Sequence, residues 1–151
     1  MTQILIAADH AGFALKQTLI EYLTQQSHVC TDLGTNSTDP VDYPDFAHAL
    51  ADIVDGSDAI GILICGTGTG MAMAANRHSS IRCAVAVTSR MAELARQHNN
   101  ANILALGARL TSEEHAKTIV DTFLTTNYEG GRHDARIAKI ERNVGFDSGQ
   151  P

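Results

Sequence analysis

The chain has 151 residues, a formal net charge of −6, 44% hydrophobic residues and 19% charged residues. This length suits one domain with a sizeable core, and this composition excludes long disordered, collagen-like and membrane-spanning chains. The negative charge argues against general nucleic-acid binding, and three cysteines without a Cys-x-x-Cys spacing argue against a disulfide framework or a zinc site.

Apolar segments and segments with helical spacing alternate along the chain. Each apolar segment is bounded by Gly, Asp or Asn, as is typical of strands buried on both faces of a parallel sheet. In chain order, we predict strands at 4–8, 29–33, 59–65, 81–87 and 102–106, each followed by a helix, at 15–23, 46–54, 71–76, 90–98 and 111–124. Pro44 suits the first turn of the second helix.

The fifth helix has the clearest local signals. Thr111 and Glu114 have the spacing of a capping box, and an apolar stripe runs through 116, 119, 120, 123 and 124. Beyond Gly130 and Gly131, the helical spacing of 137, 140 and 144 predicts one more helix.

The alternation predicts a doubly wound α/β domain, a Rossmann-like three-layer α/β/α fold with a five-stranded parallel sheet and an extra C-terminal helix. We expect one domain over residues 1–146 and a frayed tail at 147–151. The strand order is open between that of a dinucleotide-binding half and that of a flavodoxin-like sheet. In either case ligands bind at the carboxyl ends of the strands. The chain start lacks the features of a secretory signal, so we expect a cytoplasmic protein.

The strongest local motif is Cys65-Gly66-Thr67-Gly68-Thr69-Gly70, between a predicted strand and a helix. Its glycines allow backbone N–H groups to approach an anion or a developing oxyanion. It lacks the Lys of a P-loop and the full GxGxxG spacing, so a dinucleotide site is weakly indicated. Cys65 at a strand end can act as a base or nucleophile. A buried small hydrophobic residue is the competing interpretation.

Two further pairs combine a histidine with a polar neighbour. Asp9 and His10 follow the first strand, where they suit proton transfer or sugar binding, although Asp9 could instead cap a helix and His10 be solvated. His98 and Asn99 end the fourth helix. His98 continues the apolar face of that helix, so a buried histidine bonded to a carbonyl is the plainer interpretation.

Positive charge is concentrated in the second half of the chain. Residues 1–76 carry nine acidic side chains against Lys16 alone, giving −8, whereas residues 77–151 carry ten basic and eight acidic side chains, giving +2. Arg132 and Arg136, four residues apart, suit a phosphate clamp, although pairing with Asp134 or Glu129 is the alternative. Arg109 and Tyr43 lie after two other predicted strands and could join the site.

Together these motifs resemble one family, the type B ribose-5-phosphate isomerases and their sugar-phosphate isomerase relatives. The resemblance covers nearly the whole chain. Its motifs are Ala-Asp-His-Ala-Gly at 8–12, Asp-Tyr-Pro at 42–44, the glycine segment at 64–70, Ala-Ala-Asn at 74–76, Arg-Gln-His-Asn at 96–99, the segment 102–109, and Tyr-Glu-Gly-Gly-Arg-His at 128–133.

The resemblance implies interconversion of ribose 5-phosphate and ribulose 5-phosphate in the pentose phosphate pathway, without metal or organic cofactor. It implies that Cys65 is the base, that the backbone of Gly66 to Gly70 with Thr67 stabilises a cis-enediolate, and that His98 assists ring opening near Asp9. The substrate and its phosphate would be held by His10, Asn99, Arg109, Arg132 and Arg136. The family also implies a homodimer with the site at the subunit interface, which could pair into a tetramer, and no nucleic-acid or membrane partner.

Two departures and two alternatives accompany this interpretation. The segment 88–91, Thr-Ser-Arg-Met, differs from the Ser-Glu-Pro-Tyr sequence of bacterial members, which weakens inference about neighbouring interface contacts. Met71 stands where some subtypes carry a catalytic Glu, which favours Cys65 as the base. The alternatives are an isomerase of a six-carbon sugar phosphate, such as allose or galactose 6-phosphate, and a noncatalytic sugar-phosphate-binding module. The charge division predicts that Arg132 and Arg136 reach the Cys65 loop of a partner.

Overall fold

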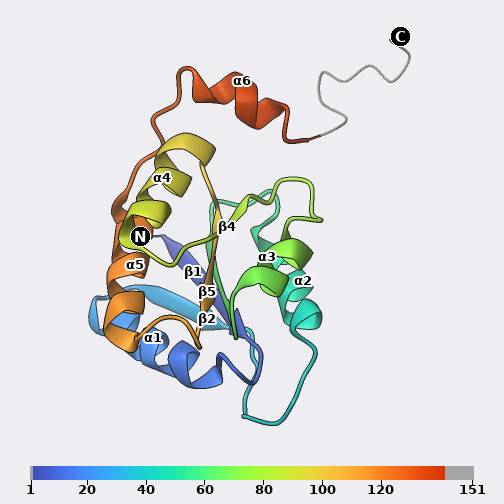
Figure 1. Cartoon of the computed structure of the whole chain (residues 1–151), viewed down its shortest axis with the longest axis vertical. Helices are drawn as coiled ribbons and strands as arrows, with labels where there is room; N and C mark the ends of the chain where they lie inside the picture. Colours follow the sequence, from blue (N-terminus) through green and yellow to red (C-terminus); the bar gives the residue numbers. More distant parts are fainter. Residues whose placement is uncertain (1, 142–151) are drawn as a thin grey trace.

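Five parallel strands form one sheet in the order β2-β1-β3-β5-β4 in the computed structural model, which describes residues 2–141 (Figure 1). The strands are β1 (Gln3–Ala8), β2 (Val29–Asp32), β3 (Ile60–Cys65), β4 (Cys83–Val85) and β5 (Ile103–Gly107). The helices are α1 (Phe13–Gln25), α2 (Tyr43–Val54), α3 (Thr69–Ala75), α4 (Ser89–Asn99), α5 (Glu113–Thr125) and α6 (His133–Ala138). The predicted fold class is therefore confirmed.

The strand order matches neither of the two expected sheets. Its first part, β2-β1-β3, is the flavodoxin-like arrangement, but β5 then lies inside the sheet and β4 forms the edge. Burial explains the exchange. All five residues of β5 are buried, whereas β4 has only three residues, each half-buried. The shorter, less buried strand takes the edge, where one side needs no partner strand.

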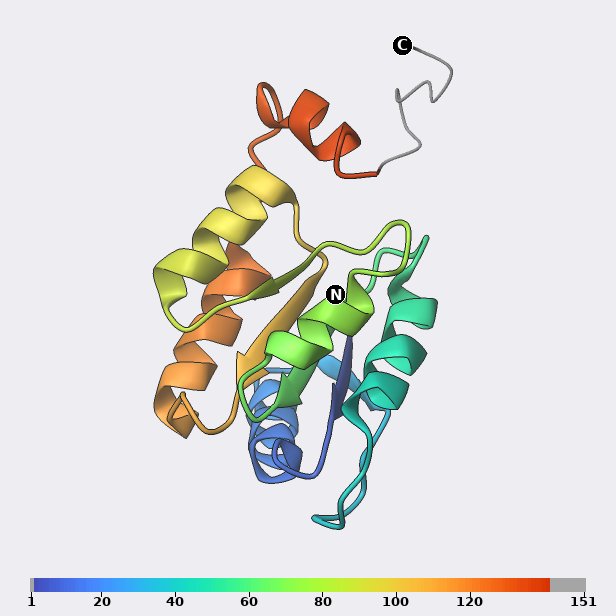
Figure 2. The same cartoon turned by 45° about the vertical axis from the view of Figure 1, so that its right-hand side comes forward.

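Helices cover both faces of the sheet. Helices α1, α4 and α5 pack on one face with Ile4, Ile6 and Ala8 of β1, while α2 and α3 pack on the other with Leu5 and Ala7 (Figure 2). The alternation of side chains along a buried strand thus supplies two hydrophobic cores from one sequence segment. Among the helices of residues 2–141, none has both the length and the apolar character to cross a bilayer.

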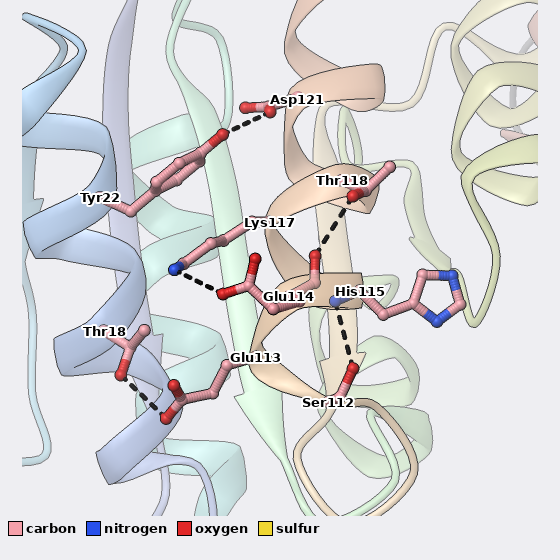
Figure 3. Close-up of polar contacts among 9 residues, drawn as sticks. All are labelled: Thr18, Tyr22, Ser112, Glu113, Glu114, His115, Lys117, Thr118 and Asp121. Atoms are coloured by element: carbon pink, nitrogen blue, oxygen red, sulfur yellow. Dashed lines mark hydrogen bonds and ion pairs between the residues drawn. The ribbon is translucent and has the colours of Figure 1, made fainter.

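Polar contacts join α1 to α5 on the outside of the first core (Figure 3). The Tyr22 hydroxyl donates to Asp121 at 2.5 Å, and Thr18 donates to Glu113 at 3.2 Å. The hydrogen bond to Asp121 is the main cause that raises the pKa of Tyr22, so this tyrosine stays neutral near neutral pH.

The N-termini of two helices test two predictions, of which one is wrong and one is confirmed. Ser112, not Thr111, caps α5, because its hydroxyl accepts from the His115 N–H at 3.2 Å, so Thr111 and Glu114 form no capping box. Thr111 is instead buried. Pro44 lies in the first turn of α2, as predicted.

The last described helix is shorter than predicted. Helix α6 ends at Ala138, so Ile140 follows it as an exposed side chain rather than extending its stripe. Figure 1 shows α6 beyond the end of α4, away from the layers that cover the sheet. Such a short helix has too little apolar surface to be drawn onto the sheet. The predicted position of Val144 and the predicted tail at 147–151 lie outside the described residues.

Lys16, the only basic residue of the first half, is fully buried. Its Nζ lies 2.7 Å from both carboxylate oxygens of Asp32 and donates to Gln17 at 3.0 Å. The Asp32 side chain, 35% exposed, also accepts from the Gly34 N–H at 2.9 Å. The pair joins α1 to the end of β2 and leaves this lysine unavailable to a ligand.

Lys16 and Asp32 differ in exposure, so replacing one or the other should lower the free energy of unfolding by different amounts. We expect Asp32→Asn to lower the free energy of unfolding by about 3 kcal/mol, since it leaves the Lys16 ammonium buried without its counter-charge. Lys16→Met leaves a partly solvated carboxylate and should cost about 1 kcal/mol or less. Urea unfolding of both variants measures the difference. Equal losses would contradict this view of the pair.

Candidate active site

Three turns meet at the carboxyl edge of the sheet, after β1, β3 and β5. Backbone hydrogen bonds hold them together: the Asp9 N–H donates to Ile64 at 3.1 Å, the Ala108 N–H to Cys65 at 2.8 Å, and the Arg109 N–H to Gly66 at 3.0 Å. The sequence places polar or nucleophilic side chains in each turn. We call the residues gathered here the loop-edge cluster, which consists of Asp9, His10, Tyr43, residues 65–70 and Arg109.

Two glycines make the turn after β3 possible. Gly68 has a φ of +82°, a conformation that side chains other than glycine rarely adopt. A Cβ at Gly107 would lie 2.8 Å from the Cα of Thr67, so only glycine lets the two turns approach so closely. Together these positions determine the path of the glycine segment.

Cys65 lies at the end of β3 with its thiol turned into this segment. The residue is 5% exposed, and the Gly68 N–H donates to its Sγ at 3.2 Å. A hydrogen bond to sulfur stabilises negative charge there, as a thiolate base requires. Next to it, the exposed Thr67 hydroxyl accepts from the Thr69 N–H at 3.4 Å and keeps its own proton to donate.

Asp9 and His10 are held in place by the backbone around them. One carboxylate oxygen of the buried Asp9 accepts from the Gly12 N–H at 3.1 Å, so the residue does shape the turn before α1. The Nδ1 of His10 accepts from the Val41 N–H at 3.1 Å. In the neutral ring the proton is therefore assigned to Nε2, which is free to donate to a ligand.

Tyr43 and Arg109 border the glycine segment on two sides. Tyr43 is the first residue of α2 rather than a loop residue, and its ring lies directly against Gly70. The Arg109 guanidinium lies over Gly66, where an added Cβ would be 3.0 Å from Nη1. Arg109 is thus the cationic group that the structure places beside the loop of Cys65.

The remaining predicted residues form a second group around α6. A hollow of about 450 Å³ is lined by His98, Asn99, Arg132, His133, Arg136, Ile137 and Ile140. We call this the α6 cluster. Both arginines line the same hollow, as the four-residue spacing predicts, and within residues 2–141 neither forms an ion pair. Asp134 instead accepts from Tyr128 at 2.6 Å.

One chain does not bring the two clusters together. The loop-edge cluster follows the carboxyl ends of the strands, whereas α4 runs back toward the start of β5 and carries His98 and Asn99 to the other end of the sheet. Figures 1 and 2 show α6 at that far end, opposite the turns after β1 and β3. Any site that uses both clusters needs two copies of the chain.

The sequence did not identify the role of His133. It is buried, and its ring stacks on that of His98 with centroids 4.4 Å apart and an angle of 19°. Glu129 lies 3.5 Å from its Nε2. Within residues 2–141, His98, Glu129 and His133 form the one group whose ligand atoms lie close enough to hold a metal. The four-residue spacing of Glu129 and His133 could have indicated that the two side chains lie together, as on one face of a helix. Gly130 and Gly131 interrupt the helical pattern between them, so the spacing was not interpreted in this way.

The other two cysteines, Cys30 and Cys83, are poor candidates for a base. Burial, with a smaller effect of nearby Cys65, raises the pKa of Cys83 to about 12, and burial also raises the pKa of Cys30. Both thiols therefore stay protonated near neutral pH.

Comparison with known proteins places this arrangement in context. The family described as Ribose/Galactose Isomerase matches residues 4–140. The chain is 43% identical over 141 residues to ribose-5-phosphate isomerase B of Escherichia coli, which covers 93% of this chain and 95% of that protein.

Solved structures agree with the sequence relatives. A ribose 5-phosphate isomerase of Thermotoga maritima has a TM-score of 0.91 at 49% identity, covering 93% of this chain and 98% of that one. Ribose-5-phosphate isomerase B of Mycoplasma genitalium, solved with bound ribulose-5-phosphate, has a TM-score of 0.91 at 45% identity, covering 97% and 98%.

The tight contact between two turns leads to a prediction. Gly107→Ala should lower the free energy of unfolding by about 1–3 kcal/mol, since its Cβ meets the Thr67 backbone and the segment must shift. Gly66→Ala is the matched control, because its Cβ meets only the end of the flexible Arg109 side chain and should cost less than about 1 kcal/mol. Urea unfolding compares the two variants. A larger loss of unfolding free energy for Gly66→Ala would show that the contact of Gly107 with the Thr67 backbone does not decide which glycine is required.

Proposed function

This chain belongs to the ribose/galactose isomerase family, and from that premise we propose that it interconverts ribose 5-phosphate and ribulose 5-phosphate. It is an isomerase, as its named relatives are. The observation that carries the proposal is the Gly68 N–H donating to the Cys65 sulfur at the mouth of a glycine-rich turn. This arrangement supplies a base and a set of backbone donors at one point.

The proposed chemistry moves one proton between two carbons. The Cys65 thiolate takes the proton from C2 of the open-chain aldose, the C–H electron pair forms the C1–C2 double bond, and the carbonyl electrons move to O1. The result is a cis-enediolate. Return of the proton from the Cys65 thiol to C1, with transfer of the O2 proton to O1, produces the ketose and regenerates the thiolate.

Backbone donors stabilise the enediolate oxygen. The segment from Gly66 to Gly70 presents N–H groups beside Cys65, and Thr67 adds an exposed hydroxyl. Helix α3 has only seven residues, so its dipole contributes little to stabilising the enediolate oxygen. Hydrogen bonds from the individual N–H groups provide most of the stabilisation. Asp9 and Tyr43 line the same edge and would contact the sugar.

Phosphate binding and ring opening draw on the α6 cluster. Because this cluster lies at the opposite end of the same sheet, we propose a homodimer in which Arg132 and Arg136 of the partner subunit hold the phosphate. His98 and Asn99 of the partner subunit would then reach the furanose ring, where His98 moves the proton that opens it. His10 and Arg109 would complete the binding site from the first chain.

A six-carbon substrate is the second candidate, and the family itself motivates it, since its description includes galactose as well as ribose. The chemistry at Cys65 would be unchanged, and only the depth of the pocket would differ. Comparing kcat/KM for ribose 5-phosphate with that for allose and galactose 6-phosphates decides between them.

The base assignment predicts different outcomes for two cysteines. Cys65→Ala should lower kcat by about 10²–10⁴-fold, the usual contribution of a positioned base, while substrate binding is retained. Cys83→Ser is the control, since this protonated thiol has no part in the proposed reaction. A coupled assay measures kcat, and titration calorimetry measures binding. Full turnover by Cys65→Ala would refute the assignment.

The shared site predicts complementation between two inactive variants. Cys65→Ala and Arg136→Ala homodimers should each be impaired. Each hybrid dimer, however, has one site in which both Cys65 of one chain and Arg136 of the other are intact, and one site in which both are replaced. Random pairing makes half of the dimers hybrids, so refolding an equal mixture should restore about a quarter of the wild-type sites. No recovery, in a mixture where native mass spectrometry detects hybrids, would mean that each chain completes its own site.

A further inference from the structure

Three potential metal ligands converge where the α5–α6 connection meets the end of α4. His98, Glu129 and His133 each offer one ligand atom, and these atoms all lie within 4.8 Å of one another. They come from two segments that are about thirty residues apart in sequence, so their proximity is a product of the tertiary structure.

His133 is the member that requires a partner. It is 6% exposed, and within residues 2–141 its Nε2 forms no hydrogen bond. Oε2 of Glu129 lies 3.5 Å from this nitrogen, beyond a good hydrogen-bond length. A buried ring nitrogen left unpaired lowers stability, and a bound group that used it would recover that loss.

Hydrogen bonds hold the turn that carries Glu129 and His133 in place without help from a ligand. The Glu129 N–H donates to Gln97 of α4 at 3.1 Å, and the His133 N–H donates to Gly130 at 3.3 Å. The Tyr128 hydroxyl donates to Asp134 at 2.6 Å and closes the same turn.

We propose that His98, Glu129 and His133 bind a divalent transition metal of the zinc class. Two imidazoles and one carboxylate are a zinc ligand set, and they disfavour Mg²⁺ and Ca²⁺, which prefer oxygen alone. Tetrahedral zinc places neighbouring ligand atoms about 3.3 Å apart, and the Glu129–His133 distance of 3.5 Å is already close to that. Half-buried His98 completes the set when its ring turns out of the stack on His133, since stacked rings do not aim their nitrogens at one ion.

The proposed metal site adjoins the hollow of the α6 cluster, from which a fourth ligand would reach the metal. Arg132 and Arg136 line that hollow together with His98 and His133. Their positive charges repel a dication, so we expect an affinity of about micromolar rather than nanomolar. They also attract an anion, so a phosphate oxygen or a water can fill the open position.

If the chain has the proposed function, a metal bound at this site inhibits the isomerase reaction. A metal bound to His98 occupies the ring that would otherwise move the proton in ring opening. Zinc and ribose 5-phosphate therefore compete for the same histidine, and a rise in free zinc lowers isomerase activity. The reaction itself uses no metal at this position.

Metal binding is tested first, without any activity measurement. Titration calorimetry with Zn²⁺, and visible absorption with Co²⁺ as its spectroscopic substitute, should show one site per chain in Cys65→Ala protein, which removes the reactive thiol. In that background, Glu129→Gln and His133→Asn should each weaken binding by at least about tenfold. His115→Asn is the matched control, since this exposed histidine of α5 lies outside the group.

Activity then tests the consequence in protein that retains Cys65. Glu129→Gln should keep the basal rate and lose most of the zinc inhibition seen in the wild type. Zinc should inhibit turnover of ribose 5-phosphate more strongly than turnover of its 4-deoxy analogue, which lacks the O4 needed to form a furanose and so needs no ring opening.

The outcomes separate this proposal from the proposed function. Absence of Zn²⁺ and Co²⁺ binding, or binding unchanged in Glu129→Gln and His133→Asn, would overturn the metal site even if the protein is a fully active isomerase. Binding that depends on both residues in a protein without isomerase activity would support the metal site and overturn the proposed function. Equal inhibition of both substrates would overturn the role assigned to His98.

Discussion

The close approach of two turns, after β3 and after β5, is the constraint on which the loop-edge cluster depends. The turns touch at Gly107, where there is no Cβ to separate them from Thr67, and they exchange backbone hydrogen bonds through Ala108 and Arg109. This contact sets the path of the glycine segment. The path in turn brings the Gly68 N–H to the Cys65 sulfur and leaves the Thr67 hydroxyl exposed.

The sheet also separates two chemical tasks. Its carboxyl edge holds the thiol and the backbone donors, and its other end holds the arginine pair of the α6 cluster. The division follows the charge along the chain, since the first 76 residues have a net charge of −8 and contain Lys16 as their only basic residue. That lysine is buried against Asp32, and the cation beside the Cys65 loop, Arg109, comes from the second half of the same chain. Under the proposed function, an anionic substrate would therefore bind in a site shared between two copies.

The α6 cluster combines functions that compete with one another. Arg132 and Arg136 suit an anion, whereas His98, Glu129 and His133 suit a cation, and the two histidines line the same hollow as the arginines. The stacking of His98 on His133 couples them, because His98 faces both the sugar in the proposed reaction and the metal in the proposed inhibitory site. In the proposed inhibitory site, zinc binding would reduce turnover without changing the fold.

The sequence by itself determined the alternation of strands and helices, the parallel sheet and the position of Cys65 before a glycine-rich turn, because hydrophobic period and glycine spacing are local properties. Tertiary structure alone decided that β5 lies in the interior of the sheet and β4 at its edge, that Ser112 caps α5, and that His133 is buried against His98. It also decided that α6, which carries the arginine pair, lies at the opposite end of the sheet from the turn after β3. Each of these depends on contacts between segments distant in sequence. The net charge of −6 is a property of the whole chain, whereas folding decides which charged side chains lie close enough to act together.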